Sequence, residues 1–388
     1  MSDPLLAVDD LRTYIPADGG VIRAVDGVSF EVDRGETVCL VGESGSGKTV
    51  TCDSILGLEP AASGDVSGEV RFEGRNLLSV GGAELRTIRG NRIAYVFQHS
   101  QAALDPVYTI GDQIVEAIAF HGEVTDDAAR ERAISLLRRV GLSRAGERVD
   151  QYPHELSDGM CQRVAIAVAL AAEPDLLIAD EPASALDVTI QARIIDLLET
   201  LARERDLAML LVTHDLRVVS SLADRVVVLY NGAVMERGPV DRVFAQPAHP
   251  YTQALFRSFT DDLRGGEEVE AGAGSRSKPG SGVQPPDDGC PFRLECPHAI
   301  PACRDRPPLE TVADLDTHRA ACVYYGVGRD ASTVLSEATA VGVKRDRDQE
   351  QGRERKLDRE GNRDRDEDRD RNSNPDPNWE WNRGDDGD

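Results

Sequence analysis

Lysine is almost missing from this chain of 388 residues, which has four lysines against forty arginines. Acidic residues outnumber basic ones by 69 to 44, and the formal net charge is −25. Nucleic acids and anionic lipid surfaces attract basic protein faces, so this charge argues against a nucleic-acid binder and against adsorption to lipid by charge alone. Aromatic residues make up only 5%, and both tryptophans, Trp379 and Trp381, lie in the last ten residues.

Long hydrophobic runs are also absent. The longest apolar run covers nine residues, 164–172, whereas a helix that spans a bilayer needs about 20. The first residues show no basic stretch followed by an apolar one, so we expect no secretory signal and a cytoplasmic protein. Seven cysteines in such a chain indicate metal, redox or core roles rather than a disulfide scaffold. We expect Cys39, Cys52 and Cys161 to be small core residues.

Composition divides the chain into four segments. Residues 1–259 alternate short β-branched runs with amphipathic helical stretches, which predicts a globular α/β domain. Residues 260–288 are rich in Gly, Ser, Pro and Glu and are typical of a linker. Residues 289–326 contain four of the seven cysteines. Residues 327–388 lose hydrophobic periodicity, and 28 of the last 45 residues are charged, which predicts a disordered tail.

A phosphate-binding loop is predicted between an apolar strand, 37–41, and a helical stretch that extends toward Leu58. The loop matches the pattern G-x-x-x-x-G-K-[ST], and its residues are Gly42, Glu43, Ser44, Gly45, Ser46, Gly47, Lys48 and Thr49. Glycines let successive N–H groups turn toward the phosphates, and the helix start adds a favourable dipole. We expect Lys48 to contact the β- and γ-phosphates and the Thr49 hydroxyl to bind Mg²⁺.

A second apolar strand, 175–180, ends in two acids, Asp180 and Glu181. In a phosphate-loop ATPase the first acid holds Mg²⁺, and the next can act as general base toward the attacking water. An apolar run that ends in two acids is a weak signal alone, because helix starts also favour acids. Together with the phosphate loop it predicts a Mg-nucleotide site at the carboxyl ends of neighbouring strands.

Further motifs follow in a fixed order: Gln98 after a strand, Leu156-Ser-Asp-Gly-Met160 before a helix, Ser184-Ala-Leu-Asp187, and His214 at a strand end. With the phosphate loop and the paired acids, this set resembles the ATP-binding subunits of ABC transporters over residues 5–259. The resemblance implies an α/β phosphate-loop NTPase fold with a helical subdomain at about 98–165.

The resemblance also implies roles for individual residues. Glu181, His214 and Lys48 would be catalytic, with Glu181 as base and His214 as the switch residue at the γ-phosphate. Gln98 would sense Mg²⁺ and the membrane partner, and Asp180 would be the Walker B acid. The residues implied to reach the ATP of a partner subunit are Ser157, Asp158, Gly159 and Asp187. Tyr14 is a candidate for stacking on adenine, with core packing as the alternative.

One subfamily fits best. The strings Tyr152-Pro-His-Glu-Leu-Ser, Ala185-Leu-Asp-Val-Thr-Ile-Gln191 and His249-Pro-Tyr-Thr252 look like those of oligopeptide/dipeptide importer ATPases, although nickel importers share much of the pattern. The implied partners are a second ATPase subunit, two membrane permeases and, indirectly, an extracytoplasmic peptide-binding protein, with no nucleic acid. The implied location is the cytoplasmic face of the membrane. The alternatives are a soluble ABC ATPase of translation or DNA repair and a regulatory partner that does not hydrolyse ATP.

The third position of the Leu-Ser-Gly-Gly signature departs from the family pattern, because Asp158 stands there. Two interpretations are open. Either the carboxylate faces solvent without effect, or it weakens one of two composite ATP sites and makes an asymmetric pair with a different ATPase.

The C-terminal cysteines, Cys290, Cys296, Cys303 and Cys322, lie within 33 residues that also contain several prolines. Such a segment makes a poor hydrophobic core, so a metal could stabilise it, and four thiolates suit either zinc or an iron–sulfur cluster. The resemblance implies a [4Fe-4S] cluster, and zinc or free thiols are the alternatives. We expect His298 and His318 nearby to be solvated.

The charge predicts a response to salt. The tail from Lys344 onward has 12 basic and 16 acidic residues, so −21 of the charge is on the first 343 residues. An acidic surface poor in lysine fits a halophile, whose molar salt shortens the Debye length to about 3 Å and screens this repulsion. We therefore expect thermal stability and ATPase rate to rise with KCl. Maximal activity in dilute buffer would contradict the halophile hypothesis.

Overall fold

The computed structural model describes residues 3–17, 20–58, 64–98, 103–121, 124–184, 186–263, 288–313 and 315–335. Most of the predicted linker, 264–287, and the tail from 336 onward lie outside these ranges, so their predicted disorder stays a prediction. Residues 1–343 and 344–388 form separate units, and all the elements named in the following paragraphs belong to the first.

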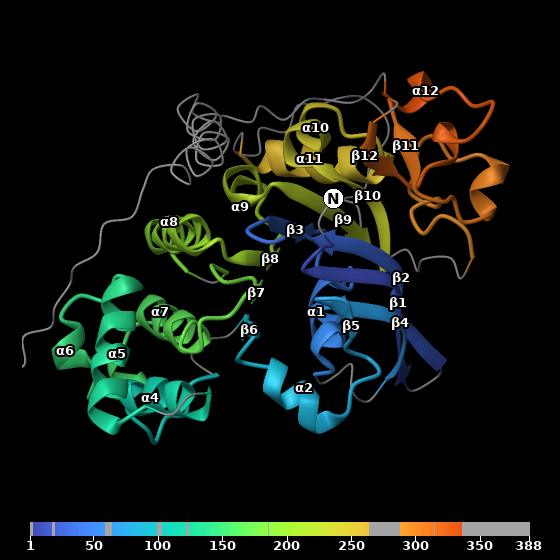
Figure 1. The fold of residues 1–388 in the computed structure, drawn as a ribbon. Coiled ribbons are helices and arrows are strands. Elements are labelled where there is room, and N and C mark those ends of the chain that lie inside the picture. The colour runs from blue at the N-terminus through green and yellow to red at the C-terminus, as the bar shows by residue number, and fades with distance from the viewer. Residues whose placement is uncertain are drawn as a thin grey trace, which may run out of the picture. The chain divides into compact units, whose positions relative to one another are not determined.

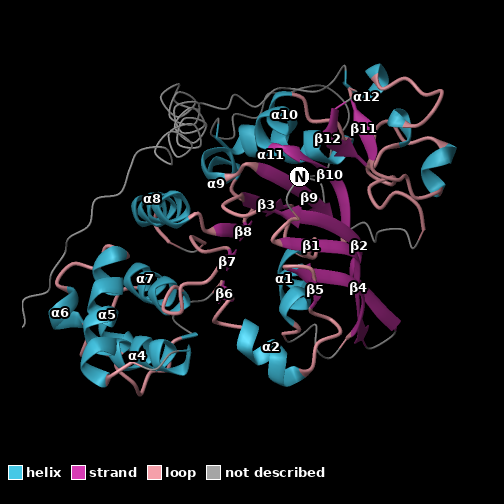
Figure 2. Cartoon of the chain, in the orientation of Figure 1, coloured by secondary structure: helices cyan, strands magenta, loops and turns pink. Residues whose placement is uncertain are grey.

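The larger sheet has eight strands in the order β11-β12-β10-β9-β3-β8-β7-β6. Its five parallel strands are β9 (Arg225–Tyr230), β3 (Thr37–Val41), β8 (Ala208–Val212), β7 (Leu176–Asp180) and β6 (Ile93–Val96). These strands read as continuous apolar runs because both faces of the sheet are covered (Figure 2). β10 (Ala233–Pro239) continues the sheet in antiparallel fashion.

A second, antiparallel sheet has the order β2-β1-β4-β5. Its strands are β1 (Leu6–Ala17), β2 (Gly20–Val32), β4 (Asp65–Phe72) and β5 (Arg75–Asn76). The helix α1 (Lys48–Leu56) contributes Cys52, Ile55 and Leu56 to a core shared by both sheets. This packing fixes the beginning of α1, and therefore the predicted phosphate loop, against the end of β3.

The other helices fall into two sets. Figure 1 shows α4, α5, α6 and α7 together in one group, whereas α8–α11 lie along the larger sheet. The helices are α2 (Gly82–Ile88), α4 (Ile110–His121), α5 (Asp126–Arg139), α6 (Ala145–Arg148), α7 (Asp158–Ala169), α8 (Val188–Arg205), α9 (Leu216–Leu222), α10 (Val240–Ala245), α11 (Pro250–Leu263) and α12 (Ser332–Leu335). Among the described helices, none has the length and apolar character that crossing a bilayer requires.

The cysteine-rich segment is part of the main fold. β12 (Leu315–Ala320) pairs with β10, and β11 (Glu310–Val312) pairs with β12. Cys290, Phe292 and Cys303 belong to the largest hydrophobic core of the described chain, so the expectation that this segment lacks a core is wrong. The apolar residues of this segment are scattered among prolines. Because their spacing is irregular, the sequence shows no periodic pattern that would predict their burial.

His318 corrects a second expectation. It is 3% exposed rather than solvated, and its Nε2 lies 2.8 Å from Oε1 of the fully buried Glu236. Cys39, Cys52 and Cys161 are buried, as predicted.

Phe292 tests how firmly the C-terminal segment is docked. Its ring is 3% exposed and packs 5.5 Å from the rings of Tyr230 and Tyr251. We expect Phe292→Ala to lower the free energy of unfolding by about 3–5 kcal/mol, because it removes a buried aromatic side chain. The control is Leu294→Ala, two residues away and 58% exposed, with an expected change below about 0.5 kcal/mol. If urea denaturation shows that both variants lose the same free energy of unfolding, the docking of Phe292 is contradicted.

Candidate functional site

The loop between β3 and α1 has a backbone that only glycine allows at its two ends. Gly42 and Gly47 have φ of 153° and 97°, values that side chains disfavour. A Cβ on Gly42 would lie 2.2 Å from the Leu229 carbonyl oxygen, and one on Gly47 would lie 2.3 Å from the Ala24 carbonyl oxygen. The loop is therefore pressed against the backbones of two neighbouring segments, which hold its N–H groups in place.

Lys48 begins α1 and turns back over the loop. Its Nζ donates to the carbonyl oxygens of Gly42 at 2.9 Å and Glu43 at 2.8 Å. Burial lowers the pKa of Lys48, while the carboxylates of Glu181 and Asp180 act in the opposite direction. The ammonium is thus positioned at the loop and faces the two acids that the sequence predicts as partners.

Asp180 ends β7 with 2% of its surface exposed. Burial raises the pKa of its carboxyl, whereas a hydrogen bond with the Thr49 hydroxyl acts to lower it. Its Oδ1 is buried and has no hydrogen-bond partner in the described part of the chain. An unpaired buried carboxylate oxygen beside a threonine hydroxyl fits Mg²⁺, which prefers oxygen ligands. These two residues therefore suit the predicted metal.

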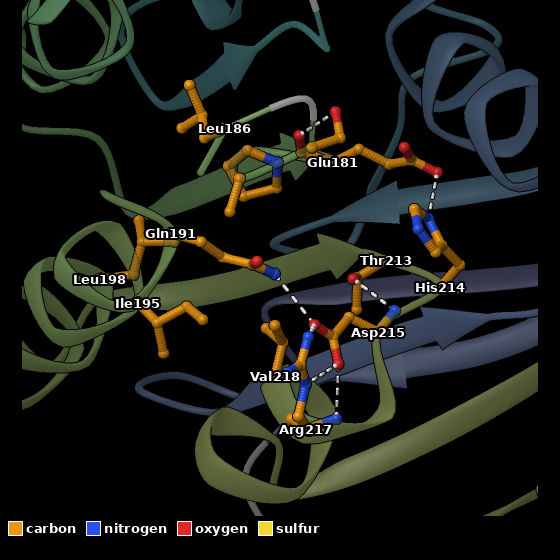
Figure 3. Close-up of a pocket in the computed structure, with 13 residues that line it drawn as sticks. Glu181, Leu186, Gln191, Ile195, Leu198, Thr213, His214, Asp215, Arg217 and Val218 are labelled. Carbon is orange, nitrogen blue, oxygen red and sulfur yellow. Dashed lines mark hydrogen bonds and ion pairs between the residues drawn. The ribbon is translucent and has the colours of Figure 1, made fainter. Parts of the chain in front are cut away.

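Three side chains converge next to this pair. Glu181 Oε2 accepts a hydrogen bond from Gln98 Nε2 at 3.0 Å, and Glu181 Oε1 lies 3.1 Å from His214 Nδ1, as Figure 3 shows for His214. The hydrogen bond with His214 lowers the pKa of Glu181 and raises that of His214. Glu181 is therefore ionised at neutral pH and able to accept a hydrogen bond from water. Gln98 follows β6, Glu181 follows β7 and His214 follows β8, so neighbouring parallel strands bring them together.

A cavity of about 190 Å³ lies beside this group, between α8 and α9. Glu181 and His214 line one end of it, and Gln191, Asp215 and Arg217 form a hydrogen-bonded cluster at the other (Figure 3). This cluster fixes the beginning of α9 directly after His214.

The residues assigned to a partner's ATP lie at the beginnings of α7 and α8. Ser157 and Asp158 are exposed at the beginning of α7, whereas Gly159 is buried; a Cβ there would lie 2.5 Å from Ile190 Cγ2. Figure 1 places α7 within the helical group rather than beside α1. Asp187 caps α8, because its Oδ1 accepts from the N–H groups of Thr189 and Ile190, each at 3.0 Å.

Tyr14 lies on β1, and its hydroxyl donates to Asp26 Oδ1 at 2.7 Å. The guanidinium of Arg23 lies over the tyrosine ring at 6.0 Å from its centroid. The ring is half-buried, and its contact with adenine stays a prediction.

The four C-terminal cysteines gather in one region. Burial raises the pKa of Cys296 to about 12, and the nearby thiols of Cys290, Cys322 and Cys303 add to this effect. Across the described ranges, however, no three His, Cys, Asp or Glu side chains are arranged so that they could hold a metal ion. The predicted iron–sulfur cluster, like the zinc alternative, therefore has no support here and stays a prediction.

Sequence reasoning missed Tyr251. Its hydroxyl accepts the Glu43 N–H at 3.2 Å, so a residue from α11 contacts the phosphate loop. The string His249-Pro-Tyr-Thr252 contains it, but this string is a subfamily signal and does not point to the phosphate loop. A contact between positions 208 residues apart leaves no local pattern.

Comparisons with known proteins show what the chain is similar to. Residues 25–184 match the family described as ABC transporter, and residues 235–303 match the oligopeptide/dipeptide transporter C-terminal region. The chain is 45% identical over 327 residues to a probable peptide ABC transporter ATP-binding protein of Sinorhizobium fredii, covering 83% of this chain and 95% of the relative. It is 43% identical over 326 residues to a dipeptide transport ATP-binding protein of Bacillus subtilis, covering 82% and 94%.

A solved structure shares the fold. It is a dimeric ATP-binding cassette in a post-hydrolysis state, bound to ADP and phosphate. The TM-score is 0.55 and the identity 29%, with 61% of this chain and 98% of the cassette covered.

Proposed function

Because the chain belongs to the oligopeptide/dipeptide family of ABC transporter ATP-binding subunits, we propose that it hydrolyses ATP to drive peptide import from the cytoplasmic face of the membrane. The relatives named above transport peptides, which favours peptide over nickel as cargo and transport over a role in translation or DNA repair. The observation that carries the proposal is the group formed by Gln98, Glu181 and His214 beside the phosphate loop.

The proposed chemistry assigns each residue one task. The loop N–H groups and Lys48 bind the β- and γ-phosphates, and Thr49 and Asp180 hold Mg²⁺, which supplies charge neutralisation when it is bound. Glu181, held ionised by its two neighbours, orients the attacking water and accepts its proton. His214 keeps Glu181 in place and would contact the γ-phosphate.

The proposed assembly is a head-to-tail pair with a second ATPase subunit, supported by the dimeric cassette that shares the fold. Each ATP would lie between Gly42–Thr49 of one subunit and the 156–160 signature of the other. The helical subdomain at about 98–165 would contact two permeases, and an extracytoplasmic binding protein would deliver the peptide. In this arrangement the peptide does not touch this chain.

Replacing Glu181 with Gln tests the catalytic assignment. We expect the ATPase rate to fall by more than about 100-fold, because an amide cannot accept the water proton. ATP binding should persist and trap the ATP-bound dimer, so peptide uptake stops. The control is Glu147→Gln, whose side chain is 75% exposed in the helical group. Continued uptake of defined peptides by the Glu181→Gln transporter would refute the assignment, and nickel uptake measured alongside tests the cargo.

Asp158→Gly tests the altered signature. Asp158 is exposed in the first turn of α7, where a carboxylate is stabilised by the N-terminal dipole of its own helix. We therefore expect the ATPase rate of the assembled transporter to stay unchanged. A higher rate after the substitution would instead support an asymmetric pair in which this carboxylate weakens one ATP site.

A further inference from the structure

Two series of hydrogen bonds and side-chain contacts connect the C-terminal segment, residues 288–335, to the phosphate loop. Each series is called a route. Neither route is implied by the nucleotide chemistry above, and both cross from β10–β12 and the cysteine-rich loops to the loop between β3 and α1. The inference rests on the proposed ATP site and concerns what holds that site in shape.

The first route begins at the buried contact between β12 and β10. Glu236 is fully buried and accepts hydrogen bonds from His318 Nε2, from Ala248 N–H and from His249 N–H, each at 2.8 Å. A buried carboxylate with three partners fixes the chain that leads into α11. His318 thus connects the C-terminal segment to the beginning of this helix.

His249 connects the buried Glu236 to Tyr251. The ring of His249 is 1% exposed, and its Nδ1 accepts the Tyr251 N–H at 3.0 Å. Burial lowers the pKa of His249 to about 3, and a hydrogen bond to the backbone of Ala321 opposes this shift. The ring is therefore neutral at physiological pH, and because Nδ1 accepts, its proton is on Nε2.

Tyr251 ends the first route. Its side chain has no exposed surface, and its hydroxyl accepts the Glu43 N–H at 3.2 Å. Its ring centroid lies 4.5 Å from that of Tyr230 and 5.5 Å from that of Phe292. Tyr230 in turn donates to Glu295 Oε1 at 2.6 Å. The C-terminal segment therefore packs on this tyrosine through Phe292 and bonds to its neighbour Tyr230 through Glu295.

The second route approaches the loop from β2. Arg306 Nη1 lies 2.7 Å from Asp26 Oδ2, and Arg306 also bonds to the Asp26 carbonyl oxygen. The Asp26 N–H donates to Gly232 O at 2.8 Å, and the Gly232 N–H donates to Ser46 O at 2.9 Å. Two backbone hydrogen bonds thus join a side chain of the C-terminal segment to the other end of the phosphate loop.

We propose that Tyr251 and Asp26 are positioning residues of the ATP site, and that the C-terminal segment holds the phosphate loop in its nucleotide-binding form through them. The two routes end at Glu43 N–H and Ser46 O, which flank the middle of the loop. The loop must keep its N–H groups turned inward before ATP arrives, and a preorganised loop binds with less ordering cost. Neither residue touches the reacting atoms, so both act on binding rather than on the chemical step.

The test uses the full chain and two matched pairs of variants. Tyr251→Phe removes one hydroxyl from the first route, and Tyr324→Phe is its control, because the Tyr324 hydroxyl donates to His298 O within the C-terminal segment. Arg306→Gln interrupts the second route, and Arg319→Gln is its control, because the Arg319 guanidinium donates to Asp316 O nearby. MgATP affinity is measured by calorimetry, and KM and kcat are measured in the assembled transporter.

We expect each route variant to bind MgATP about fivefold more weakly, as the loss of one hydrogen bond predicts. KM should rise by the same factor while kcat stays at the wild-type value. The two controls should match the wild type in every measurement. A merely structural role would lower the melting temperature and leave the nucleotide affinity of the folded protein unchanged.

Wild-type affinity in both route variants would overturn the proposal, and a loss in only one of them would overturn the claim of two routes. If Tyr251→Phe fails to fold, Arg306→Gln still decides, because the Arg306 side chain is 39% exposed and its replacement leaves the core intact. Failure of the wild-type chain to bind MgATP would count against the proposed function instead, so the two failures are distinguishable.

Discussion

Backbone crowding around the phosphate loop sets the geometry of the whole ATP site. Carbonyl oxygens from Leu229 and Ala24 lie where side chains at Gly42 and Gly47 would stand, so both positions require glycine in this conformation of the loop. That conformation determines where Lys48 begins its helix and therefore where its ammonium meets Asp180 and Glu181. Any change that moves the flanking segments would move the charges at the site with them.

The parallel sheet then explains how distant residues meet. Gln98, Glu181 and His214 each follow a strand of the same sheet, and adjacent strands place their carboxyl ends at one edge. The hydrogen bonds of Glu181 to the other two keep it ionised, which suits a group that handles a water proton. The signature residues lie on α7 instead, which fits a site completed by another subunit.

The cysteines of the C-terminal segment suggest a metal site, but the contacts of the segment indicate a role in the packing of the main fold. Its strands extend the larger sheet, and Cys290, Phe292 and Cys303 join the main core. Hydrophobic burial and strand pairing hold it in place in the described chain, where the thiols form no metal-binding group. This segment lies outside the ATPase motifs, yet hydrogen bonds connect it to the phosphate loop of the ATP site.

The α/β class was predictable from the sequence, because apolar runs alternate with amphipathic stretches. The catalytic residues are a prediction from local signals, namely the glycine loop and the strand-end acids. The folded chain alone shows that His318 is buried against Glu236 and that Tyr251 bonds to Glu43. These contacts join positions 82 and 208 residues apart, and a hydrogen bond between distant segments imposes no spacing on either of them. The burial of Phe292 could not be predicted from the sequence either, because its partners Tyr230 and Tyr251 come from other elements.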